Sequence, residues 1–104
     1  MAFHVNHRYG AAESDPPLSS LPLLLRELAD RPEDAEHTDV SVTHESEWCI
    51  SAFMAGYLIL ENLESGQPRH MRDVPDAKII ELWSLLAVGD LEKVMSEPWK
   101  PGYK

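Results

Sequence analysis

The sequence has little of what most enzyme active sites need in a recognisable pattern. Cys49 is its single cysteine, so no internal disulfide can form, and a reducing compartment such as the cytoplasm is the expected location. The five glycines form no phosphate-binding loop, and no serine stands in a Gly-x-Ser-x-Gly turn. These absences exclude the common signatures of nucleotide-binding enzymes and of serine hydrolases.

Long apolar runs are also missing. The richest stretch, Leu21 to Leu25, is interrupted by Pro22 and is far shorter than the roughly 20 residues of a membrane-spanning helix. Because the first residues lack a basic segment followed by an apolar run, we expect no signal peptide. The sequence predicts a soluble protein with no membrane partner, and its 104 residues are enough for one domain, residues 1–104, with one core.

Basic residues are scarce in the middle of the chain. Between Glu27 and Glu64 there are ten acidic residues and one basic residue, Arg31, which gives this segment a formal charge of −9, the same as that of the whole chain. An acidic surface repels phosphate groups and anionic lipids, and it accelerates encounters with basic proteins. We therefore expect no direct nucleic-acid partner, and a basic protein is the favoured partner.

Three segments show the features of helices. Ser20 can cap the first, which has the 3.6-residue apolar period and is expected to end near Asp30. Asp73 can cap the second, which has the same period and is expected to run up to Gly89, a residue suited to a left-handed helix end. Asp90 can cap a short third helix.

Alternating apolar and polar residues indicate strands. They predict strands at residues 3–5, 40–43, 48–53, 57–60 and 69–72, the last of them at a sheet edge. Residues 48–53 and 57–60 flank Gly56 and form the clearest hairpin signal. Residues 10–17, which include Asp-Pro-Pro, are expected to be a loop. The predicted fold class is α+β, with a small antiparallel sheet of three to five strands, built on a central hairpin, packed against two or three helices.

Histidine and cysteine offer no obvious site for a metal or a cofactor. His4 and His7 are three residues apart, which on a strand puts them on opposite faces, and His44 lacks the second histidine of a helical zinc motif. We therefore expect no metal, no cofactor and no catalytic residue. If a metal site exists, His37 with His44 is the place for it, and a small enzyme using His37, His44 and Cys49 remains as an alternative.

Aromatic residues are the better candidates for contacts with another protein. Tryptophan and tyrosine are enriched at binding hot spots as well as in cores. Trp48 begins the predicted hairpin beside Glu45 and Glu47, where an interface contact is possible. Trp99 and Tyr103 lie on a C-terminal tail that cannot be helical, and we expect them to fold back onto the domain.

The central hairpin and the C-terminal half carry a resemblance to a known group of proteins. It rests on Val40-Ser41-Val42, residues 47–53, residues 56–62, and the segment from Trp83 to Asp90 that closes in Pro98-Trp99. In length, acidity and order of elements, the chain resembles small immunity proteins encoded beside bacterial polymorphic toxins, including those that neutralise Rhs-type and type VI secretion effectors. The resemblance covers about the last two thirds of the chain. It implies no catalytic residues, because such proteins bind the toxin and block its active site or substrate groove.

Charge and resemblance together predict a function. We expect an immunity protein that binds and inhibits a cognate secreted bacterial toxin through an acidic surface facing a basic active-site cleft. The candidate partner-binding residues are Glu33, Asp34, Glu36, Asp39, Glu45, Glu47, Trp48, Glu61 and Glu64. The alternative is a homodimeric scaffold or regulatory protein without catalytic activity, which pairs through an exposed strand edge or through residues 99–103.

Overall fold

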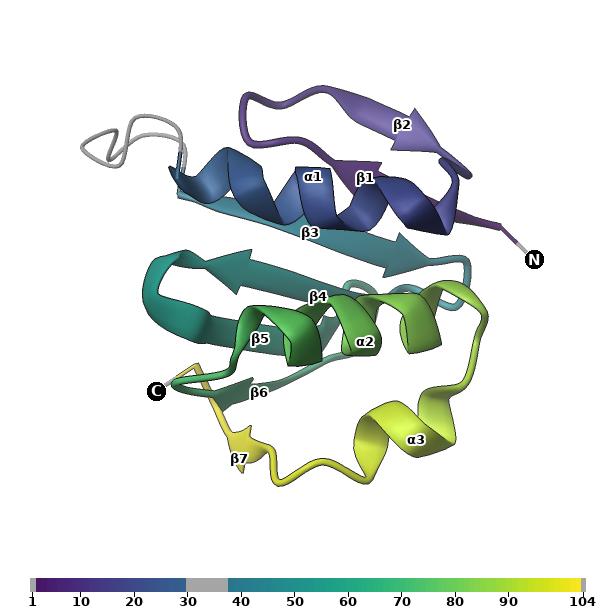
Figure 1. Cartoon of the computed structure of the whole chain (residues 1–104). Coiled ribbons are helices and arrows are strands. Elements are labelled where there is room, and N and C mark those ends of the chain that lie inside the picture. Colours follow the sequence, from purple (N-terminus) through teal and green to yellow (C-terminus); the bar gives the residue numbers. More distant parts are fainter. Residues whose placement is uncertain (1, 30–37, 104) are drawn as a thin grey trace.

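A seven-stranded antiparallel sheet forms the centre of the protein, in a computed structural model that describes residues 2–29 and 38–103 (Figure 1). Neighbouring strands pair in the order β2-β1-β3-β4-β5-β6-β7. The strands are β1 (Phe3–Asn6), β2 (Ala12–Ser14), β3 (Asp39–His44), β4 (Trp48–Phe53), β5 (Tyr57–Asn62), β6 (Gly66–Met71) and β7 (Lys100–Pro101).

The helices cover one face of this sheet (Figure 1). They are α1 (Leu21–Arg26), α2 (Asp76–Ala87) and α3 (Leu91–Met95), with single 3-10 turns at η1 (Leu18–Ser20), η2 (Glu27–Ala29) and η3 (Met54–Gly56). α1 and α2 lie side by side on the sheet, and α3 packs next to α2. Among the described helices, none has both the length and the apolar character that crossing a bilayer requires.

The core lies between the sheet and these helices. Val42, Ile50 and Leu60 stand opposite one another on β3, β4 and β5, so they form one apolar row across the sheet. The side chain of Trp83 in α2 is fully buried, and its Nε1–H donates to the carbonyl oxygen of Ile50 at 3.0 Å. Complete burial of one large apolar side chain contributes about 1.5–3 kcal/mol, so this layer is the main source of stability.

The predicted hairpin of β4 and β5 is confirmed. Gly56 in the connection has a φ of 73°, which favours glycine. The backbone N–H of Val74 donates to the carbonyl oxygen of Gly56 at 3.0 Å. A Cβ atom on Gly56 would lie 2.7 Å from the carbonyl oxygen of Val74, so this close approach requires a residue without a side chain.

The sheet is larger than the predicted three to five strands. β2 lies within residues 10–17, where a loop is predicted, and all three of its side chains are exposed, so no apolar alternation marks it. β7 has only two residues, including Pro101, and is too short to give a periodic signal. Because β7 pairs with β6, the strand predicted at residues 69–72 is not the edge of the sheet.

The first helix is shorter than predicted. It ends at Arg26 and continues as the 3-10 turn η2, while the expected end at Asp30 lies outside the described residues. Ser20 does not cap it through its side chain, because the hydroxyl donates to the carbonyl oxygen of Pro17 at 2.7 Å instead.

The other two predicted caps have different outcomes. Pro75, not Asp73, is the residue before α2, and Asp73 has a φ of 57° and lies outside the helix. Asp90 does cap α3, since its side chain accepts a hydrogen bond from the backbone N–H of Lys93 at 3.3 Å. Gly89, with a φ of 81°, provides the predicted left-handed end after α2.

The second face of the sheet, here called the open face, carries no helix from the described residues (Figure 1). Its side chains are those that alternate with the core positions. They include small and polar residues as well as aromatic and charged ones: Asn6, Ser41, Thr43, Cys49, Ser51, Phe53, Tyr57, Ile59, Glu61 and His70. Although no described helix covers this face, Ser41, Thr43, Cys49, Ile59 and His70 are buried.

Candidate functional site

The predicted acidic residues are divided between two ends of the sheet. Glu45 and Glu47 lie in the turn between β3 and β4, and Glu64 lies in the turn between β5 and β6. Asp39 begins β3 and therefore lies at the opposite end of that strand. Glu33, Asp34 and Glu36 lie outside the described residues. The structure therefore brings together three of the predicted acids, here called the acidic turn cluster: Glu45, Glu47 and Glu64.

Hydrogen bonds fix the two turns that carry this cluster. The backbone N–H of Leu63 donates to the carbonyl oxygen of Glu47 at 2.8 Å, which ties one turn to the other. The side chain of Asn62 accepts from the backbone N–H of Glu64 at 3.0 Å, and its amide nitrogen donates to the carbonyl oxygen of Ser46 at 3.3 Å. The carboxylates of the cluster are thus presented from a rigid backbone.

The side chains of the acidic turn cluster are free to meet a partner. All three residues are exposed, and within the part of the chain that the structure describes none of their carboxylates forms an ion pair. Leu63 lies beside Glu64 in the chain and is 54% exposed, so the same end of the sheet also presents apolar surface. Protein interfaces combine an apolar core with a polar rim.

The remaining described candidates are in different environments. Asp39 is half-buried, and this burial raises the pKa of its carboxyl group, while a hydrogen bond from Thr38 partly opposes the rise. Glu61 lies on the open face, where its carboxylate accepts a hydrogen bond from the hydroxyl of Tyr103 at 2.6 Å. Trp48 packs partly against the core, and the guanidinium of Arg69 lies 5.8 Å from the centre of its ring.

The residues considered for an enzyme site are not brought together. Cys49 is opposite Thr43 on the open face, so His44, the next residue along β3, points to the other face of the sheet. Burial raises the pKa of the Cys49 thiol, which disfavours the reactive thiolate, although nearby hydroxyl groups partly offset this. His37 lies outside the described residues.

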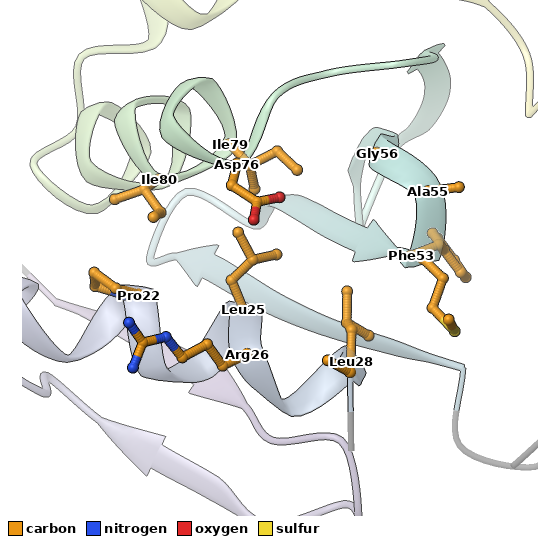
Figure 2. Close-up of a pocket in the computed structure, with 12 residues that line it drawn as sticks. Pro22, Leu25, Arg26, Leu28, Phe53, Ala55, Gly56, Asp76, Ile79 and Ile80 are labelled. Atoms are coloured by element: carbon orange, nitrogen blue, oxygen red, sulfur yellow. The ribbon is translucent and has the colours of Figure 1, made fainter. Parts of the chain in front are cut away.

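A groove of about 430 Å³ opens between α1, α2 and the η3 turn (Figure 2). Its walls are mainly apolar, and two charged residues, Arg26 and Asp76, line it from opposite helices. A second hollow of about 430 Å³ is also lined by residues of η3, together with Tyr57, Arg72 and Asp73. Met54 lines both hollows and is 46% exposed.

The sequence did not indicate this groove or Leu63 as candidate sites. The groove is formed by segments far apart in the chain, and its apolar walls also serve as core positions, so no local pattern marks it. Leu63 follows a strand and precedes a turn, where one exposed leucine is unremarkable. The acidic block and Trp48 beside it are the local signals that point to this end of the sheet.

No protein-family model, no curated protein and no solved structure matches this chain significantly.

Proposed function

We propose that this protein is an immunity protein that binds and inhibits a cognate secreted bacterial toxin, with its acidic turn cluster facing a basic cleft of that toxin. The observation that carries the proposal is the arrangement of Glu45, Glu47 and Glu64, which are exposed, unpaired among the described residues and held on two connected turns. The resemblance of the central hairpin and the C-terminal half to polymorphic-toxin immunity proteins supports the same function.

Electrostatics explain how such a cluster would favour a basic partner. Exposed charges act over roughly 8 Å at physiological ionic strength, and they increase the rate at which oppositely charged proteins meet. Because the turns are already fixed by hydrogen bonds, little further backbone order has to be gained on binding. Leu63 then offers an apolar contact that gains in value as water leaves the interface.

The experiment compares two charge-reversed variants in their association with the purified toxin domain that the proposal requires as partner. The first variant, Glu45→Lys with Glu64→Lys, reverses two members of the cluster. The matched control, Glu81→Lys with Glu92→Lys, makes the same change in net charge at exposed residues of α2 and α3. We expect the first to slow association at low salt by about tenfold and the control to have a much smaller effect.

Two results would contradict the proposal at different levels. Equal slowing by both variants would mean that net charge matters and that the acidic turn cluster is not the contact surface. Failure of the wild-type protein to protect cells that express the toxin domain it binds would remove the immunity function itself. The binding and protection assays therefore separate the surface from the activity.

A homodimeric scaffold is the second candidate function, and the surface around Met54 favours it. Met54 is exposed and lines both hollows, and each hollow has one arginine and one aspartate in its lining. Two copies related by a two-fold axis could place Met54 of each in a hollow of the other, with opposite charges facing each other. The tail suggested by the sequence is less suitable, because Trp99 Nε1–H donates to the carbonyl oxygen of Val94 at 2.8 Å within the same chain.

Sedimentation equilibrium distinguishes this second candidate from the first. A homodimer formed through the hollows should be present at micromolar concentration, should persist at high salt, and should be lost in Met54→Glu. A matched Leu18→Glu variant changes another exposed apolar residue, one that lines neither hollow, and should leave the dimer intact. A wild-type protein that stays monomeric at these concentrations would eliminate the scaffold.

A further inference from the structure

His7, which directly follows β1, lies between two carboxylates from different parts of the fold. Its Nδ1 atom is 2.6 Å from Oε2 of Glu27 in η2, and its Nε2 atom is 3.0 Å from Oε1 of Glu13 in β2. His7, Glu13 and Glu27 are here called the histidine latch. β2 is the strand at the outer edge of the sheet (Figure 1). Through the two contacts of His7, the latch connects β2 to the end of the helical segment that begins with α1.

The number of protons in the latch decides whether both contacts can exist. Each contact joins a nitrogen to a carboxylate oxygen, and each needs one proton between them. An ionised carboxylate only accepts hydrogen bonds, and a neutral imidazole has a single N–H. Both contacts are therefore satisfied when His7 is an imidazolium, and loss of one proton removes one of them.

The surroundings of His7 favour the protonated state. Hydrogen bonding to Glu27, and then to Glu13, raises the pKa of His7 above its ordinary value of 6.5, while burial acts in the opposite direction. Within residues 2–29 and 38–103, Arg8 is a further charged residue beside the latch, and its backbone N–H donates to Glu27 Oε1 at 2.9 Å. The proton is therefore retained into the pH range above 6.5.

The contact with Glu13 is the one that deprotonation should break. The Glu27 side chain is 29% exposed and is also held by Arg8, whereas the Glu13 side chain is 52% exposed and, among the described residues, bonds only to His7. The Glu13 contact is also the longer of the two. Glu13 is the one residue of β2 whose side chain forms a hydrogen bond within the described part of the chain.

We propose that the histidine latch is a pH-sensitive device that fastens the edge strand β2 to the helical layer while His7 is protonated and releases it when His7 loses its proton. In the described sheet β2 pairs with β1 alone, and all its side chains are exposed. Besides that pairing and the hydrogen bonds between Phe3 and Asp15 at its end, the contact of Glu13 with His7 is what holds β2 in the described part of the chain. After this release, β2, the outer strand of the sheet, would no longer be connected to the helical layer through His7. The acidic turn cluster has no part in this device, so the inference stands independently of the proposed function.

The test follows His7 and the β1–β2 ribbon by NMR between pH 5.5 and pH 9.5 in the full chain. The side-chain signals of His7 give its titration midpoint. Hydrogen exchange of the Asp15 amide, which donates to the carbonyl oxygen of Phe3 at 2.9 Å, reports pairing in the ribbon. After correction for the intrinsic pH dependence of exchange, we expect its protection factor to fall about tenfold as His7 deprotonates, in line with the loss of one hydrogen bond to a charged group.

A matched pair of variants separates the latch from general effects of charge. Glu13→Gln should lower the midpoint of His7 and remove the pH-dependent change at Asp15. Glu64→Gln makes the same chemical change at an exposed carboxylate far from His7 in the fold and should do neither. The Leu63 amide, which donates to Glu47 in the other part of the sheet, serves as a reference whose protection stays constant.

Two outcomes would overturn the inference. One is an Asp15 protection factor that does not change as His7 titrates. The other is a Glu13→Gln variant that keeps the midpoint and the pH dependence of the wild type. Neither result depends on a toxin or any other partner, so it leaves the immunity proposal untouched.

Discussion

The guanidinium of Arg8 donates to the carbonyl oxygen of Glu27 at 2.9 Å and so joins the segment after β1 to the end of the first helical segment. The same nitrogen lies 3.3 Å from the carbonyl oxygen of Leu28. Carbonyl groups in the last turn of a helix have no partner within the helix and carry partial negative charge. Arg8, which is 4% exposed, supplies the missing donors and a compensating positive charge.

Replacing Arg8 by methionine should destabilise the fold. The apolar part of the side chain is kept, but the part-buried carbonyl group of Glu27 and the buried carbonyl group of Leu28 lose this donor. We expect the free energy of unfolding to fall by about 2–4 kcal/mol, as for the removal of a buried charged hydrogen-bond partner. Urea unfolding followed by circular dichroism measures it. Arg72→Met, at an exposed arginine, should cost less than about 1 kcal/mol, and equal losses in both variants would contradict the role given to Arg8.

Gly56 and Gly66 test whether the η3 turn depends on close packing or only on backbone conformation. Both have positive φ, 73° and 85°, but a Cβ atom on Gly56 would meet Val74, whereas one on Gly66 would meet nothing within 4 Å. Alanine at Gly66 should cost about 1 kcal/mol for the backbone alone. Alanine at Gly56 should cost more, because the Val74 backbone must also move. Equal melting temperatures for the two variants would show that Val74 adjusts without cost.

Trp83 and Trp99 allow a second matched comparison of substitutions. Each donates an indole N–H to a carbonyl group, Ile50 for Trp83 and Val94 for Trp99, but only Trp83 is fully buried. Trp83→Phe should lower the free energy of unfolding by about 2–3 kcal/mol, because it creates a cavity and removes a buried hydrogen bond. Trp99→Phe should cost about 1 kcal/mol or less, since water can replace the lost donor. Chemical denaturation measures both, and a larger loss at Trp99 would contradict this assignment of the core.

The elements that the sequence predicts best are those whose apolar residues repeat. In β3, β4 and β5 the core residues are spaced two positions apart along each strand. Val42, Ile50 and Leu60 are three of these residues, and the strand register places them in one row. β2 has no such residues, because it is exposed on both faces, and only its pairing with β1 makes it a strand. Arg8 illustrates the same limit, since a charged residue in a turn gives no sign that it will be buried.

The sequence predicts only part of the candidate site, and the reason is the geometry of the strands. Asp39 and Glu45 are six positions apart and belong to one acidic block in the sequence, yet β3 occupies the residues between them. A strand advances about 3.3 Å per residue, so these two positions are separated by roughly 20 Å. Glu64, which is much further away in the sequence, returns to the same end of the sheet as Glu47 through the β4–β5 hairpin. Charge counted along the chain therefore identified the acids without showing which of them lie together.

Asp39 allows a prediction about pH in which the direction follows from its environment. Burial raises the pKa of this carboxyl group above 3.8 in the folded protein, so the folded state holds the proton more tightly than the unfolded state does. A group of this kind stabilises the fold below its unfolded pKa, and this contribution is lost as pH rises through its folded pKa. At neutral pH the ionised, half-buried Asp39 therefore destabilises the protein.

The variant Asp39→Asn should show this as a difference that depends on pH. Near pH 3, where the wild-type carboxyl group is protonated, the free energies of unfolding of the two proteins should be similar. As pH rises towards 7, the variant should become the more stable of the two, because asparagine has no charge to desolvate. Urea unfolding at several pH values measures the gap, with Glu64→Gln as the reference for removing one exposed negative charge. If the variant instead becomes less stable than the wild type as pH rises, the carboxylate of Asp39 is stabilised in the fold, and its half-buried environment does not disfavour its charge.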